Sequence, residues 1–156
     1  TFINVKDVIL KIKKDLKKIT KTDVKIRFVN KFHTEPQSLN LNTTSRKFTK
    51  PNYPICFDGF RSICPVTSQP DFAKIYILTS AKIEIQWLRK LLISFRESGE
   101  FHEQCIEDIF SKLQSKYSQE KFEVCGRFLR RGGIDINPIR SSKKSLFFKN
   151  FRAFNQ

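Results

Sequence analysis

Apolar residues near the start of the chain recur at intervals of three and four positions, the pattern of one face of an amphipathic helix. These residues are Val5, Val8, Ile9, Ile12, Leu16 and Ile19. The other face is mostly lysine, and Asn4 is well suited to cap the first turn. Apolar and basic residues then alternate over residues 24–28, which predicts a half-buried strand. A helix and one strand cannot bury themselves alone, so we expect residues 1–30 to be the end of a larger unit.

This periodicity stops in residues 31–54, where serine, threonine, asparagine, lysine and proline predominate. Such a composition predicts a linker or long surface loop, with at most one poor edge strand near Leu39. Apolar character resumes at Phe57, and the pattern predicts strands over residues 57–64 and 74–79.

Two helical stripes follow these strands. The first contains Leu88, Leu91, Leu92 and Phe95, and the second contains Ile106, Ile109, Phe110, Leu113 and Tyr117. We expect Gly99 to cap the first helix, residues 122–128 to form a strand, and a last strand to follow. The pattern therefore predicts that residues 55–142 form an α+β unit with the element order ββααββ. The basic and aromatic residues 143–156 are either a docking arm or a frayed tail, and we favour the frayed tail.

The composition narrows the classes of function. The chain has 156 residues, enough for one core, and no apolar run approaches the ~20 residues that a membrane span needs. Its four cysteines make no zinc pattern with its two histidines, so we expect no metal. No secretory signal is visible, so we expect reduced thiols and a cytoplasmic location. The net charge of +15 is spread along the chain rather than clustered, so we do not expect direct nucleic-acid binding.

The first candidate for chemistry is the pair Cys64 and Asp71. Pro65 and Pro70 bracket the segment between them and exclude a helix there. A cysteine and an aspartate held on a stiff loop can act as nucleophile and proton donor. The alternative is a buried, inert cysteine near a turn aspartate.

Two further candidates lie downstream. His102 can exchange a proton near neutral pH, and Glu103 can accept two ring N–H groups at once, although a carboxylate also suits a helix start. Arg131 precedes the pair Gly132 and Gly133, and arginine before a glycine turn is suited to a phosphate. The spacing is not that of a Rossmann fingerprint.

Three motifs occur together in one order, namely residues 64–72, 94–105 and 131–138. In this combination the sequence resembles the NADPH-dependent 7-cyano-7-deazaguanine reductases, the nitrile reductases of queuosine biosynthesis. The resemblance covers residues 57–142 and is closest to the second half of the long, two-module form of that family. It implies the tunnelling fold, an antiparallel sheet backed by two helices, and assembly into barrel-like homo-oligomers of two or more chains.

The resemblance also implies roles for the candidate residues. Cys64 would attack the nitrile carbon to form a thioimide, and Asp71 would supply a proton. His102 and Glu103 would hold the small deazaguanine substrate, with His102 also serving in catalysis. The resemblance further implies that Arg131 and Gly132 contact NADPH.

One departure from the family pattern concerns the cofactor. The family's glutamate-serine-lysine motif corresponds here to Glu84, Ile85 and Gln86, so the serine and lysine are missing. In the long form that motif lies in the first module, and this chain starts at Thr1 and has no methionine. We therefore expect the chain to be incomplete at its N-terminus and to reduce nitriles poorly alone. Two alternatives remain open, an amidine-forming relative of archaeosine synthase that acts on nitrile-bearing tRNA, and a non-catalytic module of the same fold.

Overall fold

The computed structural model describes residues 2–154 and 156, and the chain divides into two compact units, residues 1–32 and 33–156. The first unit contains helix α1 (Val5–Thr20), which the apolar spacing predicted. The Oδ1 atom of Asn4 accepts a hydrogen bond from the Asp7 N–H at 3.1 Å, so the predicted cap is confirmed. None of the side chains of α1 is buried.

The strand predicted over residues 24–28 is wrong, because no strand forms there. Val24 and Ile26 are half-buried and their neighbours are exposed, so the alternation is present. A strand also needs a neighbouring strand to pair its N–H and C=O groups. The first unit, as described from residue 2 to residue 32, holds no second strand, so the segment pairs with none and is not a strand.

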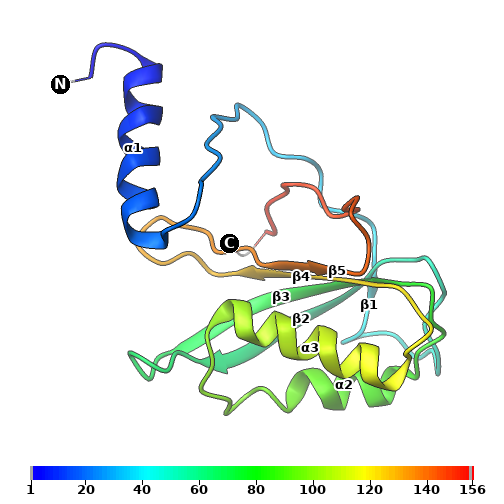
Figure 1. The fold of residues 1–156 in the computed structure, drawn as a ribbon. Coiled ribbons are helices and arrows are strands. Elements are labelled where there is room, and N and C mark those ends of the chain that lie inside the picture. The colour runs from blue at the N-terminus through cyan, green and yellow to red at the C-terminus, as the bar shows by residue number, and fades with distance from the viewer. Residues whose placement is uncertain (1, 155) are drawn as a thin grey trace. The chain divides into compact units, whose positions relative to one another are not determined.

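The second unit is built on a five-stranded sheet with the strand order β1-β2-β3-β4-β5. The strands are β1 (Leu39–Asn40), β2 (Ile55–Ile63), β3 (Pro70–Thr79), β4 (Phe122–Phe128) and β5 (Ile139–Ser141). All neighbours pair antiparallel except β1, which runs parallel to β2. Helices α2 (Ile85–Ile93) and α3 (His102–Lys116) cover one face of this sheet (Figure 1). The predicted α+β class and ββααββ order are confirmed, and the arrangement is compatible with the tunnelling fold.

The helix-covered face holds the main apolar core. The predicted stripes of α2 and α3 supply Leu88, Leu92, Ile106, Ile109 and Leu113, all buried against Phe60, Ile75 and Val124 of the sheet. Burial of such side chains is the principal stabilising term for a unit of this kind. The poor edge strand predicted in the linker is also confirmed, as β1.

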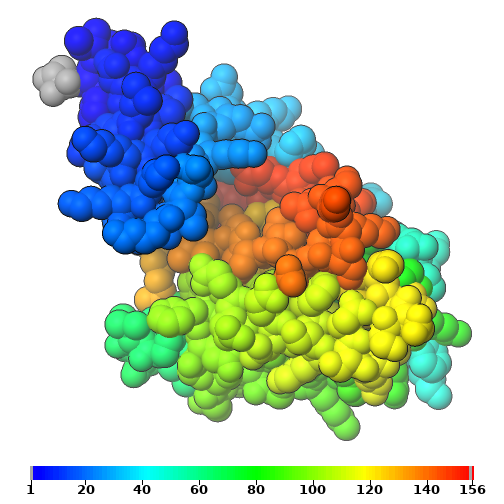
Figure 2. Space-filling view, viewed as in Figure 1, coloured from blue at the N-terminus to red at the C-terminus, as the bar shows by residue number. Residues whose placement is uncertain are grey.

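The opposite face of the sheet is covered by the end of the chain, so the frayed tail we favoured is wrong. Phe148 and Phe151 are buried against Tyr76, Cys56 and Cys125. These aromatic side chains stay docked because their rings are buried on the sheet face opposite α2 and α3. In Figure 2 the orange and red C-terminal residues form a continuous layer on the second unit.

Two boundaries differ from the prediction. Strand pairing continues to Ile63 and resumes at Pro70, so the turn between β2 and β3 is shorter than expected. The C-cap of α2 is Ser94 rather than Gly99. Gly99 instead forms a β-bridge with Ile63, whose N–H donates to the Ser98 carbonyl at 2.8 Å. No helix among the described residues is long and apolar enough to cross a membrane.

Candidate active site

Cys64 begins the turn between β2 and β3, immediately after the strand pair Ile63–Pro70. Its backbone N–H donates to the Gln69 carbonyl at 2.8 Å, and its carbonyl accepts from the Ser68 N–H at 2.9 Å. Ser68 adopts a left-handed conformation with φ of 55°. The turn is therefore closed by hydrogen bonds at both ends, which fixes the position of the thiol.

The environment of Cys64 favours its thiolate. A side-chain hydrogen bond with Thr67, followed by backbone hydrogen bonds from Thr67 and Val66, lowers the pKa of the Cys64 thiol. The other cysteines are buried, and burial raises the pKa of Cys105 to about 11 and that of Cys125 to about 12. Because the thiolate is the nucleophile, Cys64 is the cysteine best suited to attack an electrophile.

Asp71 lies close by on β3, with only 6% of its surface exposed. Its Oδ2 atom lies 3.1 Å from His102 Nε2, and its Oδ1 atom accepts hydrogen bonds from Arg131, one of them from Nε at 2.8 Å. The structure thus joins an aspartate from β3, the first residue of α3 and an arginine after β4. These are three of the residues singled out from the sequence.

Phe128 packs against the ring of His102. The sequence did not predict Phe128 as a site residue. The two rings stack with centroids 4.1 Å apart and an angle of 15° between their planes. Gly126 makes room for this arrangement, because a Cβ atom there would lie 2.6 Å from a Phe128 ring carbon. A glycine inside an otherwise bulky strand often marks such a close approach, and that was the available signal.

Arg131 is positioned by a tight turn. Arg131 and Ile134 exchange backbone hydrogen bonds of 3.1 and 3.0 Å around Gly132 and Gly133, whose φ angles are 57° and 81°. Two successive positive φ values define the hairpin turn that glycine pairs favour. The turn is open, since a Cβ on Gly132 would meet no atom within 4 Å.

This turn fits part of a cofactor site. Exposed glycine N–H groups and a guanidinium that is 41% exposed suit a phosphate group. Arg131, however, already donates two hydrogen bonds to Asp71, which the sequence did not predict. The second residue of α3, Glu103, is exposed and next to His102, where the helix dipole favours a carboxylate.

Comparison with known proteins finds relatives that match the part of the chain that carries these residues. Residues 70–146 match the model of the family described as QueF-like protein. A protein of Legionella pneumophila (strain Lens) is 46% identical over 101 residues, which is 64% of this chain and 35% of that protein. One from Buchnera aphidicola subsp. Schizaphis graminum is 52% identical over 84 residues, 53% of this chain and 32% of that protein. One from Colwellia psychrerythraea is 39% identical over 115 residues, which is 73% of this chain and 40% of that protein.

All three relatives bear the name NADPH-dependent 7-cyano-7-deazaguanine reductase. Residues 70–146 are therefore similar to the QueF-like proteins, and the resemblance stated above is confirmed for the C-terminal part of the chain. The matched stretch spans only 32% to 40% of the length of these relatives.

Proposed function

We propose that this chain carries the nucleophile of an enzyme that reduces the nitrile of 7-cyano-7-deazaguanine to an aminomethyl group. The observation that carries the proposal is the position of Cys64. It is a thiol with a lowered pKa, fixed at the end of the hairpin that also places Asp71 against His102.

The covalent step uses Cys64 as the nucleophile. Its thiolate attacks the nitrile carbon, one C–S bond forms, and one π bond of the nitrile breaks. The nitrogen then takes one proton, which gives a thioimide. The Asp71–His102 pair, joined at 3.1 Å, is the proton source that the site offers. The contact from Arg131 fixes the carboxylate of Asp71 in that position.

Reduction requires two hydride ions and two further protons for each thioimide, and it releases the amine and the Cys64 thiol. NADPH supplies the hydrides when bound. Arg131 and Gly132 would hold part of this cofactor through the open glycine turn. His102 and Glu103, adjacent at the start of α3, would hold the deazaguanine ring, with the Glu103 carboxylate accepting its N–H groups.

The names of the relatives favour a reductase over the amidine-forming alternative and over a non-catalytic module. As part of the same proposal, the substrate is a small molecule, the protein acts in the cytoplasm, and it assembles as a homo-oligomer.

The test is nitrile-dependent oxidation of NADPH, followed by its absorbance. The chain is supplied with a family module that carries the glutamate-serine-lysine motif, because Ile85 and Gln86 replace the serine and lysine here. We expect two NADPH to be consumed for each nitrile, and none with Cys64→Ala. Conversion of the nitrile to an amidine without NADPH consumption would establish the alternative instead.

A further inference from the structure

A cavity of about 430 Å³ opens at the edge of the sheet where β2 is irregular. The pairing of β2 with β3 shifts between Phe57 and Phe60, and Gly59 there has a φ of 73°. Strand β1 pairs only with Ile55 and Cys56, and at the irregular part of β2 the side chain of Asn42 bonds the N–H and the carbonyl of Asp58, each at 2.9 Å. The cavity lies between the irregular segment and the end of α2, and its volume is in the usual range for ligand pockets.

Three arginines line this cavity, namely Arg61, Arg89 and Arg96. The guanidinium of Arg89 is fixed by the carbonyls of Leu41 and Thr44, with an Nη2–O distance of 2.7 Å to Thr44. That of Arg61 donates to the Arg96 carbonyl at 2.9 Å. Two of the guanidinium groups are thus held in place by backbone carbonyl groups, which carry no net charge.

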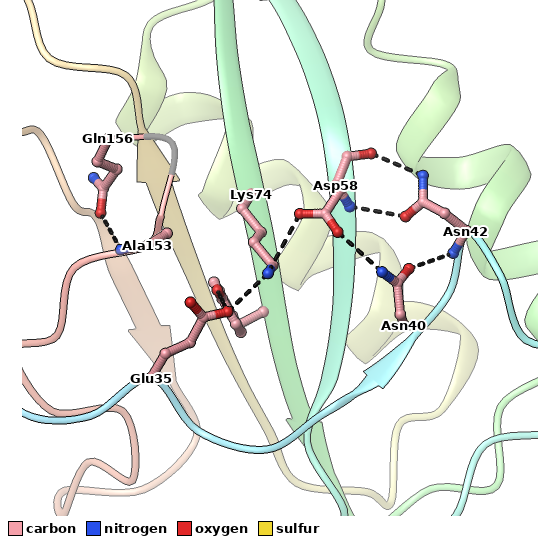
Figure 3. A network of polar contacts seen from close by, with 8 residues as sticks. Glu35, Asn40, Asn42, Asp58, Lys74, Ala153 and Gln156 are labelled. Atoms are coloured by element: carbon pink, nitrogen blue, oxygen red, sulfur yellow. Dashed lines mark hydrogen bonds and ion pairs between the residues drawn. The ribbon is translucent and has the colours of Figure 1, made fainter.

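The positive charge of the cavity is only partly neutralised. Asp58 lines the cavity, but its carboxylate is turned to Lys74 at 3.4 Å and to Asn40 at 3.0 Å (Figure 3). Glu97 pairs with Arg61 and is 75% exposed, so water screens that pair. The side chain of Arg96 has no hydrogen bond or ion pair within residues 2–154 and 156. Like charges that line one cavity are stabilised by a bound anion.

We propose that this cavity binds a phosphate monoester, the 2′-phosphate of NADPH. Guanidinium groups match phosphate oxygens in geometry and charge, and a monoester offers the highest charge density of the common phosphate groups. The cavity and the nucleophile share one strand, because Arg61 lies on β2 and Cys64 follows the end of β2 at Ile63. The proposal rests on the proposed function, since the deazaguanine substrate itself carries no phosphate.

The test is a titration of the protein followed by NMR of the arginine Nε–H groups. The probe is adenosine 2′,5′-bisphosphate, and adenosine 5′-monophosphate is the comparison ligand. We expect the bisphosphate to shift the Arg61, Arg89 and Arg96 signals and to bind about tenfold more tightly, as charge-assisted hydrogen bonds imply. Arg96→Gln should remove most of this preference while leaving the fold unchanged, because its side chain makes no hydrogen bond or ion pair with the described residues.

Arg140→Gln is the matched control, because it removes the same charge at β5, on the other edge of the sheet. Equal loss of binding in both variants would show diffuse attraction by the net charge and would overturn the proposal. So would equal affinity for the two nucleotides, or larger shifts with a short single-stranded RNA than with the bisphosphate.

A second measurement separates this proposal from the proposed function. Formation of the thioimide on Cys64 uses none of the three arginines, so the adduct should form equally in Arg96→Gln. If the adduct forms and the 2′-phosphate preference survives in Arg96→Gln, the cavity proposal alone fails. If the preference is lost as expected and no adduct forms on the unaltered chain joined to the motif-bearing module, the proposed function fails.

Discussion

Strand β3 carries a polar cluster on each of its faces. On the helix-covered face, Asp71 binds His102 and Arg131. On the opposite face, Lys74 and Tyr76 both donate hydrogen bonds to the same oxygen of Glu35, at 2.7 and 2.6 Å. Figure 3 shows the contact between Lys74 and Glu35. The two clusters begin three residues apart on one strand and use similar ionic contacts.

In the second cluster the charged groups bond one another, and these bonds hold residues 33–42 against the sheet. Lys74 also lies 3.4 Å from Asp58, which accepts from Asn40, so the cluster joins the aperiodic segment 33–42 to the sheet. Burial alone would raise the pKa of Glu35, but hydrogen bonds from Lys74 and Tyr76 outweigh it and lower that pKa. Burial, followed by the bond to Glu35, raises the pKa of Tyr76. Each of these groups therefore keeps one charge state near neutral pH.

The first cluster differs in its neighbours. It contains a histidine, the side chain whose ordinary pKa lies nearest neutrality, and it adjoins a turn that carries a partly exposed thiol. A buried ionic cluster is thus not in itself a catalytic site. A group that can exchange protons and an accessible nucleophile make the difference.

The largest expected effect comes from Gly126→Ala, which disturbs the first cluster through packing. The added methyl group would lie 2.6 Å from Phe128 and 3.0 Å from Ile106, so the Phe128 ring and the stacked His102 must move. We expect a loss of up to about 3 kcal/mol in unfolding free energy, the usual range for overpacking, and slower thioimide formation. Urea denaturation and adduct kinetics measure these two effects.

Gly99→Ala is the matched control for this substitution. A Cβ on Gly99 meets no atom within 4 Å, so stability and adduct rate should both stay near those of the unaltered chain. Equal behaviour of the two alanine variants would show that Phe128 does not position His102.

The second cluster should be broken by Glu35→Gln, which should lower the stability of the fold and leave the chemistry of Cys64 unchanged. The substitution removes the carboxylate that two donors share, so we expect a loss of about 2 kcal/mol in unfolding free energy, typical of hydrogen bonds to a charged group. The reactivity of Cys64 should not change. Glu97→Gln, which breaks an exposed pair, should cost less than about 1 kcal/mol. A Glu35→Gln variant that loses Cys64 reactivity without losing stability would remove the distinction between the clusters.

Acid should weaken the second cluster in a defined direction. The pKa of Glu35 is lower in the folded chain than its ordinary value of 4.5, so its stabilising effect is complete above pH 4.5. The effect is lost as the pH falls through the folded-state pKa. The stability difference between the unaltered chain and Glu35→Gln should therefore be largest near pH 7 and shrink below pH 4.5. A stability difference that grows on acidification would contradict the stabilising role of the ionised Glu35 carboxylate.

A smaller effect should distinguish the cysteines. At pH 7, iodoacetamide should modify Cys64 first, because its pKa is lowered, whereas burial raises the pKa of Cys56, Cys105 and Cys125. Peptide mapping by mass spectrometry identifies the modified residue, and the urea-denatured chain should react at all four positions. Fastest reaction at any other cysteine of the folded chain would assign the exposed thiolate elsewhere.

The sequence predicted the parts of the fold that follow a regular period. Leu88, Leu92 and Ile109 fall on the buried faces of their helices because helical spacing is set by local geometry. The covering of the other face could not be predicted in this way. Phe148 and the segment that carries Glu35 have no period, and the contacts that hold them come from residues distant in sequence.

The candidate site shows the same limit. Motif order pointed to Asp71, His102 and Arg131 separately, and the structure brings them into contact. The pairing of Arg131 with Asp71 could not be predicted, because it depends on the hairpin turn after β4. Phe128 was missed for a similar reason, since its contact with His102 joins β4 to the start of α3.

The central claim is that Cys64 is the nucleophile that attacks the nitrile. Incubation of the chain with 7-cyano-7-deazaguanine in the absence of NADPH, followed by intact-mass measurement and peptide mapping, tests it most directly. We expect a mass increase equal to one substrate molecule, located on Cys64, absent in Cys64→Ala and retained in Cys105→Ala. A chain that stays unmodified when joined to the motif-bearing module, or an adduct located on another cysteine, would contradict the account.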